Sequence, residues 1–184
     1  VAICEQVEDA SVAVGIVKRD VVRVITPGTL IDTSLLEDKR NNYLAAVVGT
    51  KSAWGIAYTD ISTGEISTTE INGEAKDTSL MNELAKIQPK ELIYFVENEI
   101  QEQLIKKLKQ SYNYYLNKYE MSDINSVHLE SLEGVKISNG SSKSLNNHIG
   151  IKATIALLEY IRDTQKRTLN HINHLNIYNT NETM

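Results

Sequence analysis

The stretch that most constrains the fold is 55–71, GIAYTDISTGEISTTEI, where two runs rich in β-branched residues flank a polar break at 62–64. The break ends in a glycine, which adopts a positive φ without strain, so the pattern predicts a β-hairpin with a tight loop. Apolar side chains fall on both faces of the first run, with Ile56 and Tyr58 on one face and Ile61 on the other. The sequence therefore predicts a central strand in a sheet that has helices on both sides.

The rest of the chain predicts a mixed α/β order around this hairpin. Runs at 43–49, 54–61 and 65–71 predict three antiparallel strands. The further elements expected are a helix that Asp77 caps and Pro89 ends, a buried parallel strand at 91–96, a helix that Asn98 caps with Gln101 as capping-box partner, a fifth strand at 112–119, loop composition over 120–144 and a helix at 147–165. The expected fold is α/β with a mixed five-stranded sheet, in the element order of ribonuclease H-like domains.

The two ends of the chain have a different character. Residues 1–9 predict a strand whose pairing partner is missing, so the chain looks like a piece of a longer polypeptide. Residues 17–25 predict another strand, which Thr-Pro-Gly-Thr at 26–29 ends. Its basic residues, Lys18, Arg19 and Arg23, fit either a solvated edge or a phosphate contact. The polar connection at 30–42 follows, and the asparagine-rich tail at 166–184 is expected to lead into another domain.

Composition restricts the function and the compartment. The 184 residues have a net charge of −5, which disfavours strong nucleic-acid binding by this segment alone. The single cysteine, Cys4, excludes an internal disulfide and suits a reducing cytoplasm. No run approaches the ~18 apolar residues of a membrane span, so we expect a cytoplasmic protein without membrane contact.

The acidic residues do not form the pattern of a metal-dependent nuclease. Such an enzyme needs three or four carboxylates around two metal ions, with the first on the first strand of the sheet. The run 43–49 has no acidic residue. Asp60 beside the hairpin loop is typical of a turn, and Glu97 and Asp163 lie near the ends of elements, where solvated acids are expected. The sequence therefore disfavours two-metal catalysis.

Other candidate sites have local explanations. His171 and His174 have a spacing that a metal could use, but no cysteine or acidic partner stands in register. Cys4 forms no triad pattern with His128 or His148, and no phosphate-binding loop occurs. The cluster of lysines at 106, 107 and 109 complements the dipole at the end of a helix. We therefore predict no catalytic, cofactor-binding or metal-binding residue, and no enzyme activity for this segment.

Five motifs occur in a consistent order along the chain. They are VAICEQVED at 1–9, VKRDVVRVITPGT at 17–29, NYLAA at 42–46, TDISTGE at 59–65 and LEYIRDTQ at 158–165. Together they resemble the MutS family of bacterial DNA mismatch-repair proteins. The resemblance implies that 1–28 end the mismatch-recognition domain, that 29–165 form a ribonuclease H-like connector domain without nuclease activity, and that 166–184 begin the core or lever domain.

The resemblance also implies a role. MutS proteins are ATP-driven homodimeric clamps that bind mismatched double-stranded DNA and recruit MutL. The connector domain links mismatch recognition to the ATPase and contributes to MutL docking, while ATP and magnesium belong to an ATPase domain outside this segment. Ala10 stands where the family commonly has proline, and 120–144 match the family poorly.

Two other hypotheses stay open at this point. A ribonuclease H-like nuclease or resolvase would depend on metal ions and on Asp60. A free-standing regulatory domain unrelated to repair would share the fold but none of the family's partners.

Overall fold

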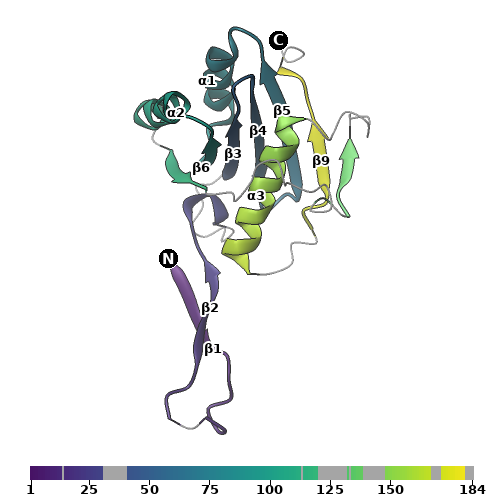
Figure 1. Cartoon of the computed structure of the whole chain (residues 1–184). Helices are drawn as coiled ribbons and strands as arrows, with labels where there is room; N and C mark the ends of the chain where they lie inside the picture. Colours follow the sequence, from purple (N-terminus) through teal and green to yellow (C-terminus); the bar gives the residue numbers. More distant parts are fainter. Residues whose placement is uncertain are drawn as a thin grey trace.

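The computed structural model of the chain describes residues 1–13, 15–30, 41–112, 114–119, 132, 134–138, 148–166 and 171–180 (Figure 1). Most of the predicted connection at 30–42, most of the predicted loop at 120–144, and His128 lie outside the described residues.

The main sheet contains all five strands that the sequence predicts. β3 (Tyr43–Gly49), β4 (Ala53–Asp60) and β5 (Glu65–Asn72) form the antiparallel meander. β6 (Glu91–Val96) runs parallel to β3, and β7 (Tyr115–Lys118) runs parallel to β6. Burial fits the expected central hairpin, because β4 has covered side chains on both faces. The sequence-based prediction of a mixed sheet is confirmed in these elements.

The sheet is nevertheless wider than predicted, with seven strands among the described residues in the order β7-β6-β3-β4-β5-β9-β8. β9 (His174–Ile177) pairs in parallel with β5, and β8 (Lys136–Ser138) pairs in parallel with β9. The predicted count of five strands is therefore wrong, as is the expectation that the whole tail after residue 165 leaves the fold. On β9 only alternate positions face the core, so buried Leu175 alternates with exposed neighbours and the segment looks polar.

Helices cover both faces of the sheet, as expected. α1 (Lys76–Ile87) and α2 (Glu99–Tyr112) cover one face, around a core that includes Trp54, and α3 (Ile149–Gln165) covers the other. α3 packs across β3, β4 and β5. Its long buried arc agrees with the wide apolar face in its sequence.

The helix starts differ in detail from the predictions. The prediction of Asp77 as a cap is wrong, because Ala75 occupies the N-cap position of α1 and Asp77 lies in the first turn. There the Asp77 carboxylate accepts a hydrogen bond of 2.7 Å from the Trp54 indole. Asn98 does cap α2, accepting from the Gln101 backbone N–H at 3.0 Å. The Gln101 side chain accepts from the Glu97 N–H rather than from the Asn98 N–H of a capping box, and donates to the Thr50 carbonyl at 2.8 Å.

A separate two-stranded sheet precedes this body. β1 (Ala2–Gln6) pairs antiparallel with β2 (Arg19–Val24), so the expectation that the first strand has no partner in the chain is wrong. The hairpin projects from the main sheet in Figure 1, and the short 3₁₀ helix η1 (Pro27–Thr29) follows it. A two-stranded sheet alone buries little, and Val7, Val12 and Ile16 are exposed in the segment that connects β1 to β2. In the described part of the chain, no helix is long and apolar enough to cross a membrane.

Candidate functional site at the junction of the two sheets

The Thr-Pro-Gly-Thr segment at 26–29 lies where the hairpin meets the main sheet. Proline suits the first position of η1, because an N–H at that position would have no hydrogen-bond partner within the helix. The Thr26 N–H donates to the Thr29 hydroxyl at 2.9 Å, and the Thr29 N–H donates to the Thr26 carbonyl at 3.1 Å. Thr29 is completely buried. The turn is therefore closed by its own threonines and then inserted into the body of the protein.

Glu91, the first residue of β6, anchors this turn. Its side chain is completely buried and accepts two hydrogen bonds, from the Gly28 N–H at 2.9 Å and from the Tyr160 hydroxyl at 2.5 Å. The shorter length is typical of a charge-assisted O–H···O bond. Burial, and next the bond to Glu91, raises the pKa of Tyr160 to about 12. Tyr160 on α3 is therefore a neutral donor, and Glu91 joins η1 to α3.

The glycine of the motif is required by space. A Cβ atom at Gly28 would lie 2.8 Å from both the Glu91 Cβ and the Leu44 Cδ1. Carbon atoms do not approach this closely, so any side chain would push η1 away from β3 and β6. The glycine permits the close contact that lets Glu91 reach the backbone.

Asn42 holds the turn from the other side. Its side-chain amide donates to the Pro27 carbonyl at 3.0 Å and to the Leu30 carbonyl at 3.2 Å. Its backbone N–H donates to Asp60 Oδ2 at 3.0 Å. The other oxygen of Asp60 accepts from the N–H and hydroxyl of Ser62, at 3.0 and 2.6 Å, which confirms the predicted turn role of Asp60. We call Gly28, Asn42, Glu91 and Tyr160 the junction cluster.

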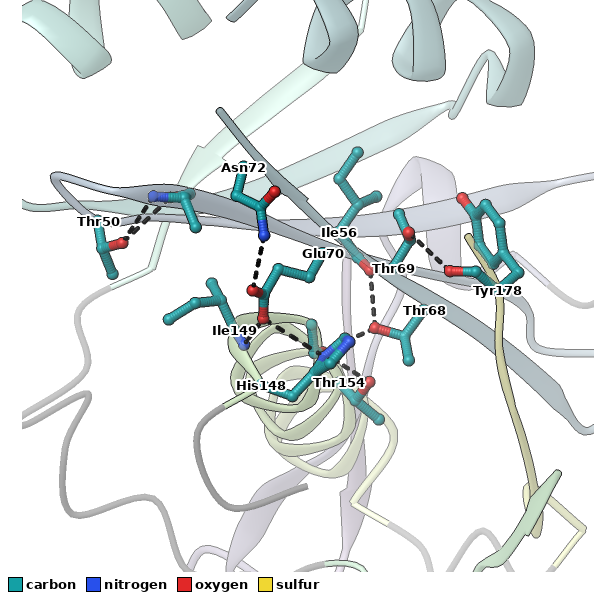
Figure 2. Close-up of polar contacts among 12 residues, drawn as sticks. Thr50, Ile56, Thr68, Thr69, Glu70, Asn72, His148, Ile149, Thr154 and Tyr178 are labelled. Carbon is teal, nitrogen blue, oxygen red and sulfur yellow. Dashed lines mark hydrogen bonds and ion pairs between the residues drawn. The ribbon is translucent and has the colours of Figure 1, made fainter. Parts of the chain in front are cut away.

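A second polar cluster fixes the opposite end of α3 (Figure 2). Glu70 on β5 accepts from the Ile149 N–H at 2.8 Å, at the start of the helix, and lies 3.9 Å from the His148 ring. The Thr68 hydroxyl lies 2.8 Å from the carbonyls of Ile56 and Gly150. A carboxylate at a helix N-terminus satisfies free N–H groups and complements the dipole.

His148 and β9 complete this second cluster. Burial lowers the pKa of His148, against the opposing effect of Glu70, so the ring is held neutral. The Thr69 hydroxyl donates to the Tyr178 carbonyl at 2.8 Å, just after β9. A Cβ at Gly150 would lie 2.7 Å from the Thr69 carbonyl, so a glycine is needed for this approach of helix to strand. α3 therefore spans from β5 and β9 to the junction cluster, about 16 Å along its axis from Ile149 to Tyr160.

The structure separates the acidic candidates for catalysis. Glu97 lies exposed between β6 and α2, where it accepts from the Lys51 N–H at 3.2 Å, and Asp163 is exposed on α3. Among the described residues, no group of three or more histidine, cysteine, aspartate or glutamate side chains is placed to hold a metal ion.

The other candidate residues have local contacts. The His171 ring lies 2.8 Å from the Ile61 carbonyl, and the His174 ring lies 2.7 Å from the Asn173 side chain. Cys4 is exposed on β1, whereas His148 lies at the start of α3. Lys106 forms an ion pair of 2.8 Å with Glu102, so this lysine serves the surface of its own helix.

Sequence reasoning missed the junction cluster. Glu91 and Tyr160 are 69 positions apart, and no local pattern connects them. The one available signal was the acidic residue at the start of the apolar run 91–96. A carboxylate at such a position either is exposed to solvent or accepts hydrogen bonds from other parts of the protein.

The chain matches two family models. Residues 42–173 match MutS domain II and residues 1–34 match MutS domain I, so the junction cluster joins Gly28 of the domain I match to three residues of the domain II match. Proteins named DNA mismatch repair protein MutS are 50% identical in Alkaliphilus oremlandii, 46% in Alkaliphilus metalliredigens and 40% in Halothermothrix orenii, in each case over all of this chain. The chain spans 20–22% of the length of these relatives. It therefore belongs to the MutS family of DNA mismatch repair proteins and includes parts of domains I and II.

Proposed function

We propose that this segment is the non-catalytic connector module of a mismatch-repair MutS protein. In this role it links the mismatch-recognition domain to the ATPase and clamp domains, and contributes to MutL docking. The observation that supports the proposal most directly is the junction cluster, in which the completely buried Glu91 bonds η1 on one side and α3 on the other.

The geometry supports mechanical coupling between the two ends of the segment. The hairpin continues into η1, and η1 is bonded through Glu91 to Tyr160 near the end of α3. The beginning of α3 is bonded to Glu70 of β5, which pairs with β9. A helix fixed at both ends transmits a displacement as a rigid body, because packed cores deform in discrete steps rather than continuously.

We propose a ribonuclease H-like fold for the main sheet, in agreement with the antiparallel β3-β4-β5 meander followed by the parallel β6 and β7. The resemblance implied that the recognition domain ends at 28 and that the connector covers 29–165. Because β9 belongs to the main sheet, we extend the proposed connector to Ile177 and start the core domain after it rather than at residue 166.

The partners follow from the family as proposals for the whole protein. They are mismatched double-stranded DNA, MutL and a second MutS subunit, with ATP and magnesium in a domain outside this segment and a cytoplasmic location. We propose no catalytic role here, since Asp60 accepts hydrogen bonds on both of its oxygens, from the Asn42 N–H on one and from Ser62 in its own turn on the other.

The coupling role is tested in the full-length protein with the substitution Tyr160→Phe. We expect mismatch binding to stay near the wild-type level, while the effects of mismatched DNA on ATP turnover and on MutL recruitment weaken severalfold. Tyr115→Phe, on an exposed tyrosine of β7, is the matched control. Unchanged stimulation and unchanged recruitment in a folded Tyr160→Phe protein would refute coupling through this cluster.

A nuclease assay separates the main alternative. Magnesium-dependent cleavage of DNA or RNA by the 184-residue chain, abolished by Asp60→Asn, would replace the connector hypothesis with a nuclease. We expect no cleavage by either protein.

A further inference from the structure

We propose that the loop of the β4–β5 hairpin, residues 60–64, is a clasp that couples the segment leading into the main sheet to the segment leaving it. In this proposal Gly64 and His171 are positioning residues for the signal that passes to the following domain. The inference rests on the proposed connector function and deepens it, because it names a second route besides α3. The match to MutS domain II covers 42–173, and both of its end residues bond to this loop. We call residues 60–64 the hairpin clasp.

Asp60 forms the incoming side of the hairpin clasp. Its Oδ2 accepts from the Asn42 N–H at 3.0 Å, and the Asn42 side chain donates to the carbonyls of Pro27 and Leu30. Its Oδ1 accepts from the N–H and the hydroxyl of Ser62, at 3.0 and 2.6 Å. One carboxylate therefore connects η1, through Asn42, to the turn of the hairpin.

The outgoing side of the hairpin clasp holds residues 171–173, which precede β9. The Asn173 N–H donates to the Gly64 carbonyl at 3.2 Å. The Nε2 atom of His171 lies 2.8 Å from the Ile61 carbonyl, and because a carbonyl oxygen only accepts, this nitrogen carries the proton. Ile172, between these two bonds, is buried in the same core cluster as Ile61. The loop therefore fixes the outgoing segment before it becomes a strand.

Gly64 permits this close approach. Its φ is +77°, which glycine adopts without strain, and a Cβ atom there would lie 2.3 Å from the His171 carbonyl oxygen. Ordinary van der Waals contact is 3.4–4 Å, so any side chain would push the outgoing segment away from the loop. Gly73 has a similar φ of +92°, but a Cβ there would meet no atom of the described residues within 4 Å. The two glycines therefore separate the steric effect from the backbone effect.

Bonds within the loop make the hairpin clasp a rigid unit. The N–H and the hydroxyl of Thr63 both donate to the Asp60 carbonyl, at 3.0 and 2.9 Å. The Thr59 hydroxyl donates to the Glu65 carbonyl at 2.6 Å, across the base of the loop. A closed and partly buried loop moves as one body, so a displacement of η1 reaches the outgoing segment through it.

The test uses the full-length protein and two glycine variants. Gly64→Ala should lower the protection of the backbone amides at 173–178 from hydrogen exchange by about 10-fold or more, because the added methyl group displaces the outgoing segment. Mismatch binding should stay near the wild-type level, while the effect of mismatched DNA on ATP turnover weakens severalfold. Gly73→Ala has comparable backbone strain without the clash and should leave the exchange at 173–178 and the effect on ATP turnover unchanged.

A second set of variants tests coupling across the loop. His171→Ala removes the bond to Ile61 without adding bulk and should weaken the effect of mismatched DNA on ATP turnover. His171→Gln, whose amide can donate to the same carbonyl, should restore most of it. Asn42→Ala breaks the incoming side. Because Asn42 and His171 act through one loop, Asn42→Ala/His171→Ala should weaken the effect no further than the stronger single variant does.

Distinct results would overturn the hairpin clasp. They are unchanged exchange at 173–178 in Gly64→Ala, equal loosening in Gly73→Ala, faster exchange with an unchanged effect on ATP turnover, and losses that multiply in the double variant. If Tyr160→Phe weakens the effect on ATP turnover and the clasp variants do not, the connector function stands and the hairpin clasp is refuted. If none of these variants weakens it, both proposals are refuted. Melting curves establish folding, and His171→Ala carries the test if Gly64→Ala does not fold.

Discussion

Removal of a single hydroxyl tests the junction cluster quantitatively. The substitution Tyr160→Phe keeps the ring, which packs edge to face with Tyr119 at 6.1 Å, and removes the 2.5 Å bond to Glu91 together with a longer one, of 3.3 Å, from the Asn117 amide. A hydrogen bond to a charged group contributes about 1.5–3 kcal/mol to the free energy of unfolding. Because Glu91 is completely buried, water cannot replace the lost donor without rearrangement, and we expect a loss in the upper half of this range.

Urea unfolding measures this loss. The single tryptophan, Trp54, is completely buried on the opposite face of the sheet, so its fluorescence reports global unfolding rather than local change at the cluster. Circular dichroism gives a second probe, and coincident transitions establish two-state behaviour. For a chain of this size each kcal/mol lowers Tm by about 2–4 °C, so a loss of about 2.5 kcal/mol corresponds to roughly 5–10 °C.

A control variant and a double-mutant cycle distinguish the energy of the hydrogen bond between Tyr160 and Glu91 from other effects of the substitution. Tyr115→Phe, on a tyrosine that is 52% exposed, should change stability by less than about 0.5 kcal/mol. Glu91→Gln combined with Tyr160→Phe should give a coupling energy of about 1–3 kcal/mol. A Tyr160→Phe loss within the error of the control, or a coupling energy near zero, would refute the charge-assisted bond.

Three further outcomes follow from the packing and the titration of buried groups. Leu175→Ala on β9 should lower the free energy of unfolding by about 2–5 kcal/mol, whereas His174→Ala on the same strand should be nearly neutral. Equally small effects of the two substitutions would show that this segment is a linker and not part of the core. Burial raises the pKa values of Tyr114, Tyr119 and Tyr160 to about 12, so their neutral forms stabilise the fold below pH 10 and this stability is lost between about pH 10 and 12. Tyrosinate absorbance that rises entirely near pH 10, before unfolding, would contradict that result. Burial lowers the pKa of His148, so its contribution to the free energy of unfolding is present above pH 6.5 and is lost as the pH falls through the lowered pKa. His148→Gln should therefore flatten the decline in stability at acidic pH. An unchanged dependence of stability on pH in this variant would exclude His148 as the cause.

Local patterns in the sequence predicted the central part of the fold correctly. The β-branched runs of the meander, the apolar run of β6 and the Asn98 cap of α2 each depend on neighbours in sequence, and each is found in the structure. Asp77 illustrates the boundary of such reasoning. Aspartate is a common N-cap residue, but the carboxylate of Asp77 accepts its hydrogen bond from the indole of Trp54, 23 positions earlier in the chain.

The missed features all depend on distant partners. β9 has a single completely buried residue, Leu175, and becomes a strand only because the edge of β5 is available beside it. The junction cluster likewise joins residues from three separate elements, and the isolated properties of Glu91 or Tyr160 do not reveal it. The family motifs marked Thr-Pro-Gly-Thr as significant, while the physical reason, a backbone N–H held against a buried carboxylate, required the structure.

The pairing of β5 with β9 has a consequence for the order in which the chain folds during synthesis. Thr69 and Tyr178, which are bonded beside this pairing, are 109 positions apart. At a translation rate of about 5–20 residues per second, β5 waits roughly 5–20 s for its neighbour after it leaves the ribosome. An open strand edge invites pairing with other chains. The sequence of β5, EISTTEIN, is rich in hydroxyl and acidic side chains. Water can therefore hydrate this strand during the interval before β9 is synthesised, which disfavours pairing with other chains.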